Sequence, residues 1–345
     1  GLNYGSLVLE VKSDVNVDEE FKGCAYKAIG CTIKDELIVS QEYDLNLKLN
    51  ILEETYEKKL SKVFKIKTTD KNESVKEVLY NESNVKSPII KVAKPKVIIP
   101  VFPGTNCEYD CERAFRNAGA KTETLVFRNY SKEAFAESIE NLEKQIRESQ
   151  IIMLPGGFSA GDEPDGSGKF ISTVFRNERI KDAVMDLLKN RDGLMLGICN
   201  GFQALIKLGL VPYGEIVDIE EDMATLTYNE INRHMSSIIK TKVVSKKSPW
   251  FSGVELGDIH NVAISHGEGR FVAPEKLLKQ LVENGQVATQ YVDNKGNIAL
   301  DMPFNPNGSM LGIEGITSPD GRVLGKMGHS ERIGENLYKN VPGNF

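Results

Sequence analysis

The residues around Cys199 have the types and spacing that nucleophilic chemistry requires. Cys199 lies in the sequence Gly-Ile-Cys-Asn-Gly-Phe-Gln, with a glycine two positions before it and another two positions after it. An apolar run typical of a strand precedes it and a helix-like segment follows, so a sharp strand-to-helix turn is expected here. Glycine neighbours avoid a clash at such a turn, and the amino end of a helix stabilises an anion. The pattern predicts a cysteine nucleophile; the alternative is a buried cysteine that packs as a small apolar residue.

Two further features fit attack on an amide. A thiolate that attacks an amide needs an acid for the departing nitrogen and a group that orients this acid. His329 and Glu331 offer such a pair, although His-x-Glu alone is a weak signal because most such pairs are solvated. Attack also creates an oxyanion, which needs backbone N–H donors. The sequence Gly-Gly-Phe-Ser-Ala-Gly-Asp at 156–162 is the candidate source, with a flexible glycine loop as the alternative.

Composition and charge argue against several other functions. The chain has 345 residues and a net charge of −6 spread over both signs, so no basic surface for nucleic acid is expected. No apolar run approaches the length of a membrane span, and no secretory signal is recognisable at the start. Gly168-Lys169 is followed by Phe170, where a phosphate-binding loop requires Ser or Thr.

The cysteines indicate a reducing compartment. The chain has five, an odd number in a large chain without a signal, which favours free thiols and a cytoplasmic location. Cys107 and Cys111 are four positions apart, on one face of a helix, and would suit a metal pair. Since no other cysteine or histidine lies near them in sequence, we expect no metal site.

The elements that must position these residues begin near Lys96, where short apolar runs alternate with amphipathic segments. Predicted strands cover 97–102, 125–127, 151–154 and 194–198, and predicted helices cover 108–117, 131–148, 169–176, 180–190 and 200–208. Alternation at this spacing predicts an α/β fold with a doubly wound, mainly parallel sheet. Ligands of such sheets bind at the carboxyl ends of the strands, where the glycine-containing segments follow.

The first part of the chain has a different pattern. Short apolar runs at 7–11, 28–33 and 36–40, followed by a helix-like stretch at 51–64, predict a small α+β unit. Residues 65–94 are rich in Lys, Asn, Glu, Ser and Thr, which is typical of a linker. We therefore predict an α+β fragment at 1–64, a linker at 65–94 and the main domain at 95–345. Because the chain begins with Gly rather than Met, we interpret it as cut from a longer polypeptide or as processed.

These motifs together resemble a known family. Gly-x-Cys-x-Gly-x-Gln, the Gly-Gly loop one strand earlier and the late His-x-Glu resemble the class I (triad) glutamine amidotransferases. Several segments are similar, more narrowly, to the phosphoribosylformylglycinamidine synthase family: 102–108, 156–162, 265–271, 291–293, 305–309 and 312–313, with Asn200 directly after the nucleophile. This family uses glutamine and ATP to convert formylglycinamide ribonucleotide to formylglycinamidine ribonucleotide in de novo purine biosynthesis. The resemblance covers 94–338, and 5–64 resembles, less specifically, the end of the synthetase domain in the large single-chain form.

The resemblance implies roles for named residues. Cys199 would be the nucleophile, His329 the acid and base, and Glu331 its orienting carboxylate, in a flavodoxin-like fold. The oxyanion and substrate region would comprise Gly157, Phe158, Asn200 and Gln203, the oxyanion itself being bound by the amides of Gly157 and Asn200. His266 and Arg233 would face the synthetase portion, and a purely structural histidine is the alternative for His266.

The resemblance also implies partners and cofactors. The partners are glutamine and the synthetase portion of the same polypeptide, without nucleic acid or membrane. No cofactor or metal is expected in this part of the chain, whereas ATP and Mg²⁺ are expected for the full-length enzyme.

Three positions depart from the family pattern, and two rival interpretations stay open. The family usually has proline on both sides of the late histidine, where Gly328 and Ser330 stand here, and an aromatic residue where Ala160 stands. One rival is another cysteine hydrolase or amidotransferase on the same kind of sheet, which the segments at 265–271 and 305–309 disfavour. The other is an interaction domain that has lost its chemistry, which the intact Cys, His and Glu disfavour.

Overall fold

The computed structural model describes residues 5–58, 77, 79–83, 88, 91–159, 168–220 and 222–345. The chain divides into two compact units, residues 1–65 and residues 66–345, which are described separately. No helix among these residues is both long and apolar enough to cross a membrane.

The first unit contains little regular structure. Its elements are α1 (Val17–Glu20), the antiparallel pair β1 (Leu37–Ser40) and β2 (Leu45–Lys48), and α2 (Leu49–Lys58). The strand predicted at 36–40 is therefore present, and the predicted helix starts at Leu49; its part beyond residue 58 lies outside the described residues. The strands expected at 7–11 and 28–33 do not form. A strand requires a neighbour for its backbone hydrogen bonds, and only β1 and β2 pair in the described part of this unit.

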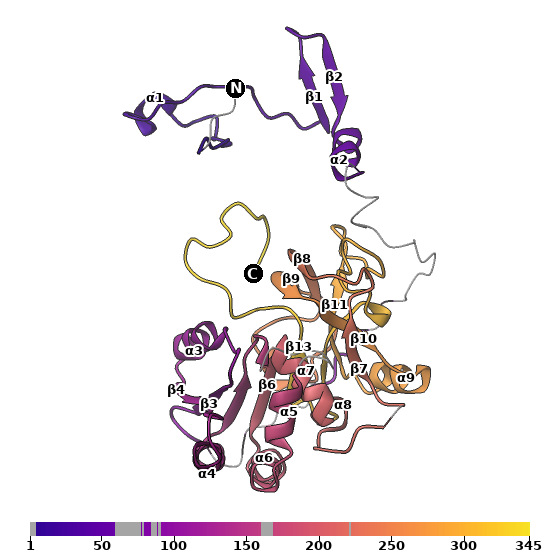
Figure 1. Cartoon of the computed structure of the whole chain (residues 1–345). Helices are drawn as coiled ribbons and strands as arrows, with labels where there is room; N and C mark the ends of the chain where they lie inside the picture. Colours follow the sequence, from indigo (N-terminus) through magenta and orange to yellow (C-terminus); the bar gives the residue numbers. More distant parts are fainter. Residues whose placement is uncertain are drawn as a thin grey trace. The chain divides into compact units, whose positions relative to one another are not determined.

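The second unit is built on a nine-stranded sheet of order β4-β3-β5-β6-β13-β12-β11-β8-β9 (Figure 1). Its strands are β3 (Lys96–Val101), β4 (Lys121–Val126), β5 (Ile151–Leu154), β6 (Leu194–Ile198), β8 (Met235–Val243), β9 (Ile259–His266), β11 (Val287–Val292), β12 (Ile313–Thr317) and β13 (Val323–Lys326). In this order, the neighbouring strands β4, β3, β5, β6 and β13 pair in parallel. The remaining neighbours, from β13 through β12, β11 and β8 to β9, pair antiparallel. The predicted α/β fold is confirmed, and the antiparallel extension was not predicted. A separate antiparallel pair joins β7 (Thr225–Tyr228) to β10 (Glu268–Val272).

The helices of this unit are α3 (Glu108–Asn117), α4 (Lys132–Glu148), α5 (Lys169–Phe175), α6 (Glu178–Asn190), α7 (Asn200–Leu208), α8 (Leu210–Tyr213) and α9 (Glu275–Glu283), with 3-10 turns η2 (Pro249–Phe251) and η3 (Met310–Gly312). Helices α3, α4, α5 and α7 follow parallel strands as the alternating pattern predicts, whereas α6 follows α5, α8 follows α7 directly and α9 lies between β10 and β11. Ser131 caps α4, because its side chain accepts a hydrogen bond from the Ala134 amide.

The central parallel strands form the core because they are buried on both faces, whereas β4 lies at the edge of the sheet and is partly exposed. In β3, Val97, Ile98 and Ile99 are fully buried. Pro100 cannot donate a backbone hydrogen bond, and β3 pairs with β5 only at Val97 and Ile98. The proline is therefore tolerated where this pairing has already ended.

Part of the predicted linker is attached to the second unit. The Tyr80 amide donates to the Val244 carbonyl at 2.9 Å, and the Tyr80 carbonyl accepts from the Lys246 amide at 2.9 Å. The Lys247 ammonium also lies 5.5 Å from the centre of the Tyr80 ring. Residues 79–83 thus run beside the segment that follows β8.

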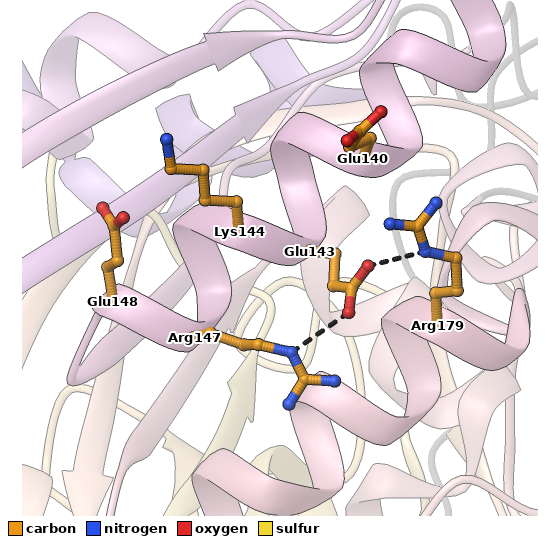
Figure 2. Close-up of a pocket in the computed structure, with 6 residues that line it drawn as sticks. All are labelled: Glu140, Glu143, Lys144, Arg147, Glu148 and Arg179. Atoms are coloured by element: carbon orange, nitrogen blue, oxygen red, sulfur yellow. Dashed lines mark hydrogen bonds and ion pairs between the residues drawn. The ribbon is translucent and has the colours of Figure 1, made fainter.

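A surface pocket lies between α4 and α6 (Figure 2). In it, Glu143 accepts hydrogen bonds from Arg147 at 3.1 Å and Arg179 at 2.6 Å, and these two bonds lower the pKa of Glu143. The lining residues are Glu140, Glu143, Lys144, Arg147, Glu148 and Arg179, none of which belongs to the predicted site.

Candidate active site

Cys199 occupies the sharp turn between β6 and α7. Its backbone has φ 51° and ψ −105°, a conformation that residues other than glycine rarely adopt and that is found mostly at functional sites. A Cβ atom at Gly197 would lie 2.7 Å from the backbone of Gly201, and one at Gly201 would overlap the Leu154 carbonyl oxygen. Both glycines are therefore required by close backbone packing, as the motif predicted.

The late histidine follows the strand that pairs with β6. Gly325 and Lys326 of β13 lie beside Gly197 and Ile198 of β6, and the Cys199 amide donates to the Lys326 carbonyl at 2.9 Å. Because the two strands are parallel, the residues after β13 emerge next to Cys199. The His329 amide donates to the Ala263 carbonyl of β9 at 2.8 Å, which fixes the loop from its other side.

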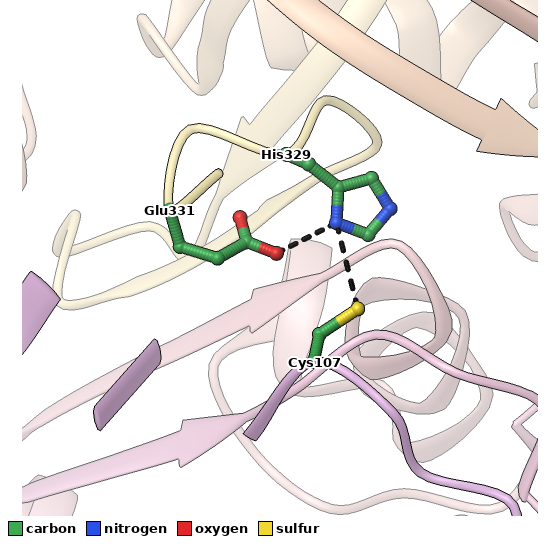
Figure 3. A group of neighbouring side chains, drawn as sticks. All are labelled: Cys107, His329 and Glu331. Carbon is green, nitrogen blue, oxygen red and sulfur yellow. Dashed lines mark hydrogen bonds and ion pairs between the residues drawn. The ribbon is translucent and has the colours of Figure 1, made fainter. Parts of the chain in front are cut away.

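His329 and Glu331 form a buried pair. The imidazole Nδ1 and the Glu331 Oε1 are 2.6 Å apart, and the two side chains are 2% and 3% exposed. Figure 3 shows that the carboxylate approaches the ring from one side while Nε2 points to the other. A carboxylate that holds Nδ1–H orients the ring and leaves Nε2 for proton transfer.

The surroundings of His329 favour its protonated form. Burial alone opposes protonation, but hydrogen bonds with the thiols of Cys107 and Cys199 and with Glu331 raise the pKa of His329 to about 12. A Cβ atom at Gly156 would lie 2.6 Å from His329 Cε1 and 3.5 Å from Cys199 Cβ, so these two side chains border the same space. A protonated imidazole beside the sulfur is suited to donate a proton to a leaving group.

Cys107 is a neighbour of His329 that the sequence did not reveal. Its Sγ lies 3.9 Å from His329 Nδ1 (Figure 3) and accepts a hydrogen bond from the Arg332 guanidinium at 2.9 Å. The sulfur, Nδ1 and a Glu331 oxygen lie within 4.8 Å of one another, as donors to a metal would. Here, however, Nδ1 and the carboxylate are hydrogen-bonded to each other. The positive charge of Arg332 beside the sulfur also disfavours binding of a metal cation.

A signal for this contact did exist in the sequence. Cys107 follows β3, and the carboxyl ends of parallel strands meet at one edge of a sheet. The spacing of Cys107 to Cys111 suggested a helical metal pair, but the relevant neighbour of Cys107 is His329. Cys111 is buried, and this burial raises the pKa of its thiol.

The predicted oxyanion loop starts directly after β5. The Phe158 amide donates to the Gly104 carbonyl at 2.9 Å, while its side chain is 49% exposed. The Ser159 amide donates to the Asn200 side-chain oxygen at 3.2 Å, which links the loop to the first residue of α7. Residues 160–167, with Ala160, lie outside the described part of the chain.

Asn200 and Gln203 support this region from α7. The Asn200 amide belongs to the first turn of the helix, where backbone N–H groups have no intrahelical acceptor. The Gln203 side chain accepts from Asn200 Nδ2 at 3.0 Å and donates to the Glu268 carbonyl at 2.5 Å. Binding of the oxyanion by Gly157 and Asn200 stays a prediction, as does contact of Phe158 and Gln203 with substrate.

His266 is buried beside the nucleophile. Its ring bonds with the Asn229 side-chain oxygen at 3.2 Å, and the carbonyl of Ser265 lies 3.8 Å from the Cys199 sulfur. Burial, with the nearby charges of His234 and His329, lowers the pKa of His266 to about 3, so the ring is neutral. The neighbouring Arg233 is half-buried, and its carbonyl accepts from Asn229 at 2.9 Å. The interface role expected for His266 and Arg233 stays a prediction.

A cysteine on a strained strand-to-helix turn, beside a buried His–Glu pair, is the arrangement that a cysteine-dependent amidotransferase requires. The profile of the CobB/CobQ-like glutamine amidotransferase domain matches residues 94–344. The chain is 38% identical over 251 residues to a Methanococcus maripaludis strain C7 protein named phosphoribosylformylglycinamidine synthase subunit PurQ, covering 71% of this chain and 84% of that protein. It is 31% identical over 248 residues to the protein of the same name from Aquifex aeolicus, covering 72% of this chain and 95% of that protein.

A solved structure agrees with this result. A chain in the structure of PurLQS from Thermotoga maritima superposes with a TM-score of 0.52 and 25% identity, covering 71% of this chain and 91% of that one. The chain therefore belongs to the glutamine amidotransferase family and, within it, to the PurQ proteins.

Proposed function

We propose that this chain is the glutaminase part of phosphoribosylformylglycinamidine synthase. It hydrolyses glutamine and supplies ammonia for the ATP-dependent conversion of formylglycinamide ribonucleotide to formylglycinamidine ribonucleotide. The observation that carries the glutaminase chemistry is Cys199 on its strained turn, beside the buried His329–Glu331 pair. The assignment to purine biosynthesis rests on the names of the relatives.

The reaction has two halves. The Cys199 sulfur attacks the carboxamide carbon of glutamine, and the backbone amides of Gly157 and Asn200 bind the oxyanion. His329 donates a proton to the leaving nitrogen, ammonia departs and a thioester remains. Water then attacks the thioester, His329 accepts a proton from it, glutamate is released, and Cys199 leaves as the thiolate that began the cycle.

The proposal includes the synthetase portion as the partner that consumes the ammonia. We place it in the same polypeptide, because residues 5–64 precede the matched region and resemble the end of a synthetase domain, although the relatives are named as subunits. ATP and Mg²⁺ would act in that portion, and the glutaminase part needs no cofactor. We also place the enzyme in the cytoplasm, in agreement with its free cysteines.

Covalent labelling tests the glutaminase assignment. We expect a glutamine-mimicking diazo ketone to add one adduct to the wild-type chain, located by mass spectrometry on Cys199. Cys199→Ala should take no adduct and release no glutamate from glutamine, with an unchanged circular dichroism spectrum. A wild-type chain without adduct, or a folded Cys199→Ala variant that still turns over glutamine, would contradict the assignment.

A further inference from the structure

A buried ion pair lies beneath the loop that carries His329. Glu314 of β12 and Lys326 of β13 lie on paired strands, and Lys326 Nζ is 3.6 Å from Glu314 Oε1. Their side chains are 0% and 8% exposed. Removing two charges from water is costly unless both are paired and hydrogen-bonded. The hydrogen bonds that satisfy this pair therefore indicate what it does.

Both charges bond to the residues on either side of His329. Glu314 Oε1 accepts from the Gly328 amide at 2.6 Å, and Lys326 Nζ donates to Ser330 Oγ at 2.5 Å. The other Glu314 oxygen is hydrogen-bonded by the Thr289 hydroxyl. The ion pair is thus hydrogen-bonded to the loop on both sides of His329.

The glycine at 328 is required by this arrangement. A Cβ atom there would lie 2.9 Å from Glu314 Oε1 and 2.6 Å from Val262 Cγ1, so the carboxylate occupies the space of a side chain. A proline at 328 would meet the same obstacle and would also lack the N–H that Glu314 accepts. The family resemblance implies proline at both of these positions. Here two charge-assisted hydrogen bonds stand at those two positions.

The same strand also holds the nucleophile. The Lys326 carbonyl accepts from the Cys199 amide at 2.9 Å, and the Met327 amide donates to the Glu314 carbonyl at 3.2 Å. A displacement of Lys326 or Glu314 would therefore change the distance between sulfur and imidazole.

We propose that Glu314 and Lys326 are positioning residues for glutamine hydrolysis, which hold the 328–330 loop so that His329 faces Cys199. The inference rests on the proposed glutaminase function. Since the pair acts on proton transfer and lies beneath the loop, its loss should lower kcat and leave KM nearly unchanged. Misplacing a catalytic group by about 1 Å can reduce the rate about 100-fold, and we expect a loss of about 10- to 100-fold.

The test compares two buried lysines. Lys326→Met removes the bonds to Glu314 and Ser330, and we expect the stated loss of kcat in glutamate release. Lys247→Met is the matched control, because Lys247 is 9% exposed and its ammonium donates to the Asn284 carbonyl, outside the histidine loop. The control should keep kcat within about twofold. An unpaired Glu314 can unfold the chain, so Glu314→Gln/Lys326→Met, which carries no unpaired charge, is measured as well.

A second readout does not depend on activity. Hydrogen exchange of the 326–332 segment should be faster in Lys326→Met and in the double variant, and unchanged in Lys247→Met. If the wild type hydrolyses glutamine, and both folded variants keep its kcat and its exchange, the inference is overturned. A wild type that does not hydrolyse glutamine contradicts the proposed function, while the exchange comparison still decides whether the pair holds the loop.

Discussion

At the scale of single residues, His329 is contacted by groups that compete for the same ring atom. Glu331 approaches Nδ1 to 2.6 Å and Cys107 to 3.9 Å, so the carboxylate holds the shared proton. The Arg332 guanidinium donates to the Cys107 sulfur and keeps this second thiol engaged. Proton transfer at the other ring nitrogen is then left to Cys199 and the substrate.

This arrangement predicts an order among variants of the pair. His329→Ala removes the proton carrier and should lower glutaminase turnover by about 10²- to 10⁴-fold. Glu331→Gln keeps a hydrogen-bonding group beside Nδ1 and should cost less, because the carboxylate only orients the ring and stabilises its charge. Single-turnover rates of glutamate formation with each folded variant test this order. Wild-type turnover in Glu331→Gln would remove that residue from the site.

The second residue-scale prediction concerns His266 and acid stability. Its pKa of about 3 in the folded chain is below that of an unfolded histidine, about 6.5, so the unfolded state binds more protons between these values. The stability that neutral His266 contributes is complete above about pH 6.5 and is lost as the pH falls toward 3. We expect His266→Gln to unfold with a flatter pH dependence in this window. Urea unfolding at several pH values measures it, with the half-buried His260→Gln as control; equal slopes in all three proteins would refute the prediction.

At the scale of elements, the contact between β5 and α7 sets where the nucleophile stands. The Leu154 carbonyl occupies the space of a Gly201 side chain. We expect Gly201→Ala to push α7 away from β5, lower the unfolding free energy by about 1–3 kcal/mol and abolish most glutaminase activity. Gly253→Ala is the control, because no atom lies within 4 Å of its Cβ position. Denaturant unfolding and turnover of both variants test this, and equal stabilities would show that the close packing is not needed.

Several elements of the parallel half could be predicted from sequence, but β4 begins at residue 121 rather than 125 and β13 was not predicted. Strands buried on both faces are continuous apolar runs, so β5 at 151–154 and α7 at 200–208 have the predicted bounds. The antiparallel half could not, because periodicity does not say which strands pair. Strand β8 pairs with the following strand β9 and also with β11, which comes later in the chain. The catalytic motif was readable, since its spacing is local. The residues around this motif were not predicted. Cys107 contacts a histidine 222 positions away, and the pairing of Glu314 with Lys326 depends on the register of two strands.

At the scale of the whole molecule, the described part of the site leaves part of its rim exposed. Phe158 of the oxyanion loop is 49% exposed, and its ring lies 6.4 Å from that of the exposed His234. Large exposed apolar side chains beside a site favour contact with a partner. Under the proposed function, that partner is the synthetase portion, and its docking would favour the competent loop conformation.

Under the proposed function, this chain depends on the synthetase portion for the ATP-dependent step. Amidine formation requires ATP to activate the acceptor amide, and the sequence contains no complete phosphate-binding motif. We expect the chain alone to make no formylglycinamidine ribonucleotide, even with ammonia and ATP. Its glutamate release should be slow alone and rise about tenfold or more when the separately expressed synthetase portion, ATP and acceptor are added. Cys199→Ala is the control, since it should lose the glutamine-dependent reaction of the mixture but leave the ammonia-dependent one. Amidine formation by the chain alone, or full-speed hydrolysis without the partner, would contradict this coupling while leaving the role of Cys199 intact.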